Sequence, residues 1–236
     1  MKWRSLEEAE TGSDTRSLRD QLAERKTLIA KYVPADIQAV HDRVVADLGQ
    51  KGITTRVLRA GVRAPEFTLE DPNGRPVASI ELLAQHRLVV CFLRGRWCPF
   101  CVAQMEAMNY ILPKLQAAGA TLVGVSPQTV QQSSFMAEQH RLKFPLLSDR
   151  GNRVARQFGL VYQVPPDQKA VYRSAFVNLA LANGDESWEL PIPATFIIEP
   201  DGRVSYASAA TDYTQRPEPA DILNWLARAA GNSPEE

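Results

Sequence analysis

The stretch LVVCFLRGRWCPFCVAQM, residues 88–105, joins two patterns through a short polar link. Residues 88–93 are continuously apolar and β-prone, which predicts a strand buried on both faces of a sheet. From Pro99 to about Leu115 apolar side chains recur at helical spacing, which predicts a helix that begins at this proline. Two cysteines, Cys98 and Cys101, therefore fall where a central strand passes into a helix.

Strand and helix patterns alternate on both sides of this junction. A hairpin around Asp71-Pro72-Asn73-Gly74 is predicted before it. After it we predict, in order, a strand at 120–127, a helix at 129–141, a strand at 144–149, a helix at 152–158, a hairpin at 194–208 and a helix at 217–230. Residues 160–190 have weak periodicity and are predicted as loop and irregular helix. This order predicts an α/β fold with a central mixed sheet and helices on both faces.

The N-terminal part of the chain has a different pattern. Apolar residues at helical spacing predict one helix from Leu18 to Tyr32 and a second from Pro34 to about Leu48. We therefore divide the chain into an N-terminal helical extension, residues 1–56, and a main domain, residues 57–236. The simplest role for the extension is a helical hairpin docked on the main domain, and the alternative is an arm that forms a homodimer.

Charge and cysteine content exclude several classes of protein. Lys and Arg together count 27, as do Asp and Glu, so neither a net basic charge nor a basic run indicates a nucleic-acid partner. No apolar stretch approaches the length of a membrane span, and residues 1–17 have no apolar signal-like core, which predicts a cytoplasmic protein. Three cysteines are too few for a disulfide scaffold, so the Cys-x-x-Cys pair is expected to be catalytic or metal-binding.

The predicted junction favours thiolate chemistry. Cys98 is expected at the N-cap and Cys101 one turn inside the helix, where free N–H groups and the helix dipole stabilise an anion. Arg94 and Arg96 add positive charge if they point inward, and Trp97 is expected to shield the thiols. Positions i and i+3 are neighbours on a helix, so the two sulfurs can form a disulfide. On helix position we expect Cys98 to be the more exposed, attacking thiol and Cys101 to resolve.

Other assignments of these residues have less support. Zinc needs about four ligands, but a second Cys-x-x-Cys is absent and the three histidines are not spaced as a pair, so no metal site is expected. Cys91 lies within the predicted strand and is interpreted as a small apolar side chain. Pro193 directly precedes a strand, a place where proline is often held in a tight or cis geometry.

Several blocks resemble one family in the same order. Trp97-Cys98-Pro99-Phe100-Cys101 resembles the active site of the thioredoxin superfamily, and Ile192–Phe196 resembles its cis-proline segment. From Gly61 to Leu226 the chain resembles the peroxiredoxin-like AhpC/TSA branch, through the blocks GVRAPEFTLED, FLRGRWCPFCVAQMEAM, GATLVGVSP, FPLLSD, PATFIIEPDGRV and DYTQRPEPADIL.

The resemblance implies a fold, a reaction and partners. The fold is thioredoxin-like, with Pro193 against the thiols. In the reaction a thiolate attacks hydrogen peroxide or an organic hydroperoxide, a disulfide forms between Cys98 and Cys101, and a dithiol protein of thioredoxin type reduces it. Nothing in the sequence indicates a cofactor.

The chain departs from the family's Pro-x-x-x-Thr-x-x-Cys motif. If Cys101 takes the peroxidatic place, Cys98 fills the threonine position and Arg94 the proline position. If Cys98 takes it, those positions hold Gly95 and Cys91. The first alignment fits slightly better, while helix position favours Cys98, so the atom that attacks peroxide stays open.

Three functions remain at this point. The first is a thiol peroxidase that cycles through a Cys98–Cys101 disulfide, and the second is a thioredoxin-type thiol–disulfide oxidoreductase. For the second, the buried acid that thioredoxins carry before the motif is replaced by Phe92. The third is a non-catalytic redox sensor that acts through the N-terminal helices. The segment Asp212–Arg216 is interpreted as a surface loop that caps the last helix, and the alternative places Arg216 or Tyr213 near the thiols.

Overall fold

The computed structural model describes residues 16–229 and 231 and contains a central seven-stranded mixed sheet. Its strand order is β2-β1-β5-β4-β3-β8-β9. The strands are β1 (Thr68–Glu70), β2 (Pro76–Ala78), β3 (Arg87–Phe92), β4 (Ala120–Ser126), β5 (Leu146–Ser148), β8 (Ala194–Ile198) and β9 (Val204–Ala209). Strands β3, β4 and β5 are parallel, and β8 runs antiparallel to β3. The predicted α/β class and mixed sheet are confirmed.

Strand β3 occupies the middle of the sheet because its side chains are apolar on both faces. Residues 88–93 are fully buried. Leu88, Val90 and Phe92 enter one apolar cluster, whereas Val89 and Cys91 enter the other. The strand ends where the sequence becomes polar. The cysteine motif therefore lies at the C-terminal ends of the parallel strands.

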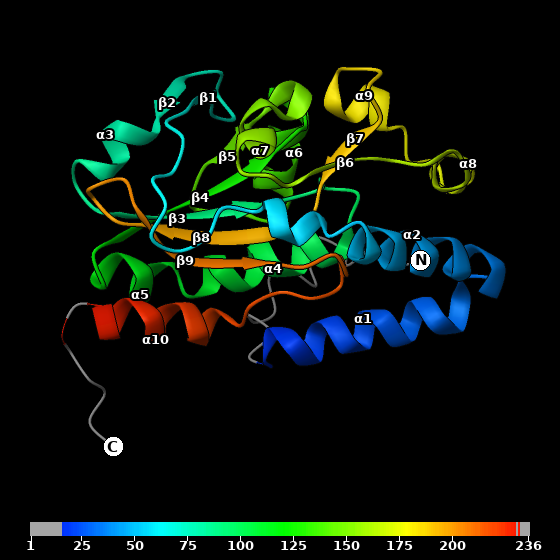
Figure 1. Cartoon of the computed structure of the whole chain (residues 1–236), viewed down its shortest axis with the longest axis horizontal. Helices are drawn as coiled ribbons and strands as arrows, with labels where there is room; N and C mark the ends of the chain where they lie inside the picture. Colours follow the sequence, from blue (N-terminus) through cyan, green and yellow to red (C-terminus); the bar gives the residue numbers. More distant parts are fainter. Residues whose placement is uncertain (1–15, 230, 232–236) are drawn as a thin grey trace.

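Helices cover both faces, as predicted (Figure 1). They are α3 (Ser79–Leu83), α4 (Pro99–Tyr110), α5 (Leu112–Ala117), α6 (Val130–Gln139), α7 (Arg153–Gln157) and α10 (Pro219–Ala229), with short 3-10 turns η1 (Ile53–Arg56) and η2 (Arg150–Asn152). The prediction of a single helix from Pro99 to Leu115 is wrong. The structure has two helices, α4 and α5, which meet at Ile111, whose φ and ψ are −89° and 1°. Pro113 lies just beyond, and its ring cannot follow an uninterrupted helix.

The segment 160–190 is more regular than predicted. It contains β6 (Val161–Gln163), α8 (Pro166–Ser174), α9 (Leu179–Asn183) and β7 (Glu189–Pro191). Strands β6 and β7 pair antiparallel in a separate two-stranded sheet. These elements are short, so their periodicity is hard to detect in the sequence, and long-range pairing fixes them instead.

The two predicted N-terminal helices are present as α1 (Leu18–Tyr32) and α2 (Ala35–Gln50), here called the helical arm. Leu18 and Leu22 of α1 pack into the cluster that contains α4, and Val44 of α2 packs into the cluster on the opposite face of the sheet. The Glu218 carboxylate accepts from the Leu18 and Arg19 amides at 3.1 and 2.5 Å, and so caps α1. The boundary between residues 56 and 57 stays a prediction, and residues 1–15 lie outside the described residues.

Candidate active site

The cysteine motif folds as its sequence predicts. Cys98 is the N-cap of α4, with φ −94° and ψ 110°, and Pro99 is in its first turn. The Cys98 amide donates to the Gly95 carbonyl at 3.1 Å, and the Cys101 amide donates to the Cys98 carbonyl at 3.0 Å. Both thiols are buried, Cys98 at 1% and Cys101 at 0% exposure, so exposure does not distinguish an attacking from a resolving thiol. The helical arm and the loop after β9 close over this helix end, which a pattern within one helix cannot reveal.

Hydrogen-bond donors converge on the Cys101 sulfur. The Arg94 backbone N–H lies 3.5 Å from Cys101 Sγ, and Arg216 Nη2 lies 3.4 Å from it. Burial alone would raise the pKa of the Cys101 thiol. The hydrogen bond from Cys98 and the charges of Arg216 and Arg94 outweigh it and hold that pKa well below its ordinary value. Cys101 is therefore the better stabilised thiolate.

The pKa of the Cys98 thiol is shifted in the opposite direction. Burial raises the pKa of its thiol, and the hydrogen bond it donates to Cys101, together with the Cys101 charge, raises it further. The surroundings of the two sulfurs favour a thiolate at Cys101 over one at Cys98, and which thiol attacks stays a prediction. Both sulfurs lie at the helix N-terminus, but the N–H groups and guanidinium groups point mainly at Cys101, so the shared proton stays on Cys98.

Arg94 points inward and is 3% exposed. Its Nη1 lies 3.9 Å from Cys98 Sγ, and its Nη2 donates to the Tyr172 hydroxyl. The guanidinium carbon lies 4.3 Å from the Tyr213 ring centroid and 4.9 Å from that of Trp97.

The charge of Arg94 needs an anion nearby. Among the described residues no carboxylate forms an ion pair with it. Burial raises the pKa of Tyr172 well above its usual range, so that hydroxyl stays neutral. A buried cation is costly without a counter-charge, and the charge of a thiolate at Cys98 or Cys101 would act on this guanidinium group.

Arg96 does not contribute to the thiol environment, contrary to the expectation for an inward-pointing side chain. It is exposed, and its Nε donates to Gln132 Oε1 at 2.6 Å. Its backbone N–H donates to buried Gln128 at 2.6 Å, which fixes the loop and turns the side chain outward. Trp97 is half-buried, with its ring centroid 5.2 Å from that of Tyr172. Its shielding role stays a prediction.

Arg216 lies at the thiols, as the alternative interpretation of its segment expected. Its Nε donates to Gln104 at 2.7 Å, and its Nη1 donates to the carbonyls of Tyr213 and Gln215 at 2.6 and 2.7 Å. These bonds aim Nη2 at Cys101. The segment Asp212–Arg216 is thus part of the site rather than only a capping loop. The available signal was the family-like block around it, since contact across 115 residues leaves no local pattern.

Pro193 does not have the expected cis geometry. No peptide bond among the described residues is cis. Pro193 lies between β7 and β8, where the chain continues in an extended path, and trans is the favoured isomer when no turn demands the other. The residue still borders the site, because it lines the same pocket as Arg94.

Comparison with known proteins identifies the family. Residues 60–207 match the AhpC/TSA family. The chain belongs to the AhpC/TSA family. Among its relatives are chloroplastic peroxiredoxin Q of Sedum lineare, 35% identical over 115 residues (49% of this chain, 61% of the relative), and peroxiredoxin Bcp of Escherichia coli K12, 27% identical over 169 residues (72% and 96%). The chain spans 53–61% of the length of the plant relatives.

Solved structures show the same fold. Peroxidoxin BcpB of Mycobacterium tuberculosis aligns with a TM-score of 0.57 at 23% identity, covering 73% of this chain and 97% of that one. Peroxiredoxin Q of Xanthomonas campestris aligns with a TM-score of 0.54 at 22% identity, covering 72% and 98%. The predicted thioredoxin-like fold of the AhpC/TSA family is therefore confirmed.

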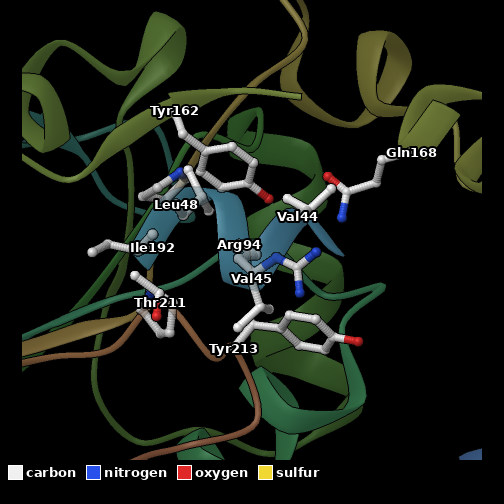
Figure 2. A pocket seen from close by; sticks show the side chains of 11 residues that line it. Val44, Val45, Leu48, Arg94, Tyr162, Gln168, Ile192, Thr211 and Tyr213 are labelled. Atoms are coloured by element: carbon white, nitrogen blue, oxygen red, sulfur yellow. The ribbon is translucent and has the colours of Figure 1, made fainter. Parts of the chain in front are cut away.

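The helical arm lies outside the family-matched residues and yet borders the site. Figure 2 shows a pocket between α2 and the sheet. It is lined by Val44, Val45, Leu48, Arg94, Tyr162, Gln168, Pro191, Ile192, Pro193, Thr211 and Tyr213. Within the described part of the chain, no cluster of His, Cys, Asp and Glu is arranged to hold a metal ion, and no helix is long and apolar enough to cross a membrane.

His41 of α2 is a neutral contact between the arm and the site. Its Nδ1 lies 3.1 Å from Gln168 Nε2, and its ring lies 5.8 Å from the rings of both Tyr172 and Tyr213. Burial, and then the charge of Arg94, lower its pKa from 6.5 to about 4. Since Nδ1 accepts from the Gln168 amide, the arm presents an uncharged face to the buried guanidinium group.

Proposed function

We propose that this AhpC/TSA protein is a thiol-dependent peroxidase in which Cys101 attacks the peroxide and Cys98 resolves. The observation that carries the proposal is the pair of donors on Cys101 Sγ, namely the Arg94 amide and Arg216 Nη2. The names of the relatives, peroxiredoxin Q and peroxiredoxin Bcp, support it.

In the first step the Cys101 thiolate attacks one oxygen of ROOH. An S–O bond forms as the O–O bond breaks, which gives the Cys101 sulfenic acid and an alkoxide or hydroxide that takes up a proton and leaves as ROH. Arg94 and Arg216 act before this step by stabilising the thiolate and during it by stabilising the charge that moves to the leaving oxygen. The Cys98 thiol occupies the position of the family's threonine and donates to the reacting sulfur.

In the second step Cys98 attacks the sulfenic acid. The S–S bond forms, the S–O bond breaks, and the oxygen leaves as water with two protons. The i, i+3 spacing on α4 keeps the two sulfurs within reach. A dithiol protein of thioredoxin type then reduces the disulfide and is itself oxidised. The cycle requires a compartment that keeps this partner reduced, such as the cytoplasm.

The alternative thioredoxin-type disulfide reductase has less structural support. Its attacking sulfur must reach the disulfide of another protein, whereas both sulfurs here are buried and Cys98, at the start of the helix, is the protonated one. A small peroxide meets neither obstacle. We therefore rank the peroxidase first, with the reductase and the redox sensor as outcomes of the test.

The test is rapid mixing of the reduced protein with hydrogen peroxide, followed by tryptophan fluorescence, for the wild type and for the Cys98→Ser and Cys101→Ser variants. The wild type and Cys98→Ser should show a fast second-order phase, and Cys98→Ser should accumulate a sulfenic acid that a dimedone-type probe traps. Cys101→Ser should lose the fast phase, a drop of about a thousandfold or more. Slow oxidation of the wild type, like that of a free thiol, would contradict the proposal.

A further inference from the structure

Aromatic rings attract the Arg94 guanidinium group but do not fix the direction of its N–H groups. The guanidinium carbon lies 4.3 Å from the Tyr213 ring centroid, a contact visible in Figure 2, and 4.9 Å from the Trp97 ring centroid. Attraction between a ring face and a cation depends mainly on the distance to the charge, whereas a hydrogen bond depends on the direction of the N–H group. A hydrogen bond is therefore needed to decide which N–H groups point at the sulfurs.

The hydroxyl group of Tyr172 supplies this hydrogen bond. It accepts from Arg94 Nη2, while Arg94 Nη1 lies 3.9 Å from Cys98 Sγ. The N–H donors of a guanidinium group form a rigid, planar fork. Because Nη1 and Nη2 extend from the same carbon atom, a bond that holds Nη2 on the hydroxyl group also fixes the direction of Nη1 toward Cys98.

The surrounding fold fixes this hydroxyl group. Tyr172 is 4% exposed, and its ring lies 5.2 Å from that of Trp97 and 5.8 Å from that of His41. It shares the buried face of α8 with Gln168, four residues earlier, and the Val177 amide donates to its carbonyl at 2.8 Å. Contacts to the side chain and to the backbone thus hold the hydroxyl group beside the guanidinium group.

A neutral acceptor suits this position better than an acidic one. Burial raises the pKa of Tyr172 well above its usual range, so the hydroxyl group keeps its proton. Among the described residues no carboxylate forms an ion pair with Arg94. A carboxylate in this position would compete with a thiolate for the positive charge. The hydroxyl group instead orients the cation and leaves its charge to act on the sulfurs.

We infer that Tyr172 is a positioning residue for the thiol chemistry, whose neutral hydroxyl group directs the Arg94 guanidinium group toward the sulfurs without cancelling its charge. The inference rests on the proposed peroxidase function and adds to it a residue of the segment 160–190, whose elements the sequence pattern did not predict. Because Tyr172 acts through Arg94, its effect on the thiols should disappear when the guanidinium group is removed.

The test is a double-mutant cycle in the full-length protein, with Tyr172→Phe, Arg94→Met and the double variant. Two quantities are measured for each protein, the second-order rate constant with hydrogen peroxide and the ultraviolet titration of the thiolate. Tyr172→Phe keeps the ring and removes the hydroxyl group. It should lower the rate constant about tenfold and shift the thiolate titration to higher pH. In the Arg94→Met background the same change should alter the rate constant by less than about twofold.

Tyr206→Phe is the matched control. It removes the same hydroxyl group from a half-buried tyrosine of β9, whose ring lies 5.6 Å from that of Trp225. Both its rate constant and its titration should equal those of the wild type. If Tyr172→Phe does not fold, the comparison is made between Tyr172→Gln, which keeps a neutral acceptor, and Tyr172→Leu, which does not. The thiolate of the glutamine variant should then titrate at the lower pH, and equal titrations would overturn the inference.

The outcomes separate this inference from the proposed function. A folded Tyr172→Phe variant with the wild-type rate constant and titration would show that the hydroxyl group is only structural, and would leave the peroxidase intact. Equal effects with and without Arg94 would overturn the inference as well, since the hydroxyl group would then act independently of the guanidinium group. If the wild type reacts with hydrogen peroxide no faster than a free thiol, the peroxidase proposal fails. The titrations then decide about Tyr172, because a shift that requires Arg94 supports its role and any other result overturns it.

Discussion

The helical arm and the sheet region, here residues 57–229, meet at one pocket but contribute different side chains to it. The sheet region supplies both cysteines and the two guanidinium groups, Arg94 and Arg216. The arm supplies Val44, Val45 and Leu48, together with a neutral histidine. The guanidinium groups near the sulfurs thus come from the sheet region, and the arm contributes uncharged side chains to the lining of the pocket. Variants on the two sides should therefore affect different measurements.

The largest effect is expected from Arg94→Met. Loss of the buried guanidinium group should lower the rate of reaction with peroxide by about 10²–10³-fold and raise the pKa of Cys101. Loss of stability should stay small compared with that of a broken buried ion pair, because the thiolate left without this cation can take up a proton and become neutral. Stopped-flow kinetics and thermal unfolding measure the two quantities. A parallel loss of rate and stability would indicate that Arg94 is only structural.

Arg216→Met should have a smaller effect of the same kind. We expect a loss of rate of about 10–100-fold and a higher pKa for Cys101, read from the ultraviolet absorbance of the thiolate. Arg96→Met is the matched control, since Arg96 adjoins the motif in the sequence but its side chain is exposed and bonds to Gln132 instead of a sulfur. If both variants shifted the pKa equally, general surface charge would explain it better than the contact with Cys101.

His41 should make the arm sensitive to acid without affecting the thiolate. Its pKa is about 4 in the folded protein and 6.5 when unperturbed, so between these values the unfolded chain binds more protons. The free energy of unfolding should therefore fall as the pH drops through this window, by on the order of 1–2 kcal/mol.

Denaturant unfolding of a His41 variant checks this expectation. In His41→Asn the fall in stability through this window should be smaller when denaturant unfolding is measured across it. The lowered pKa of Cys101 also makes stability rise with pH, but in a window that extends up to its unperturbed 9.0. An unchanged acid response in His41→Asn would mean that other groups dominate.

Glu218→Gln should have the smallest effect. It weakens the cap on the first amides of α1, which costs about 0.5–1 kcal/mol. The pKa of Cys101 and the rate with hydrogen peroxide should stay as in the wild type, because this contact fixes the arm rather than the charges. A change in the pKa of Cys101 would contradict the expectation that the arm does not affect the charges at the thiols.

The same division explains what the sequence could predict. Strand β3, the N-cap at Cys98 and both arm helices follow from local patterns of apolar spacing and proline position. The approach of Arg216 to Cys101, and the burial of Cys98 under the arm, depend on contacts between distant segments. The secondary structure of residues 160–190 was not predicted for a related reason. Their three-residue strands β6 and β7 are held by each other and carry little pattern of their own.

The resemblance to the family favoured Cys101 as the attacking thiol, whereas the position of the two cysteines on the helix favoured Cys98. Aligning Cys101 with the peroxidatic cysteine put Cys98 in the threonine position, and the interaction with Cys98 is one of the influences that lower the pKa of Cys101. Helix position alone could not separate the two thiols, because both lie in the first turn of α4. The separation comes from Arg94 and Arg216.

The most direct test of the account is the thiolate titration of the reduced Cys98→Ser and Cys101→Ser variants, followed by ultraviolet absorbance across pH. We predict that Cys98→Ser, which keeps Cys101, titrates well below the ordinary cysteine pKa, because the Arg94 amide and Arg216 remain on that sulfur. Cys101→Ser should titrate above Cys98→Ser, because burial is the largest influence on the pKa of Cys98 and no hydrogen bond of the kind that the Arg94 amide and Arg216 give Cys101 acts on it. If Cys98 instead gave the lower pKa, the assignment of Cys101 as the attacking thiolate would be contradicted.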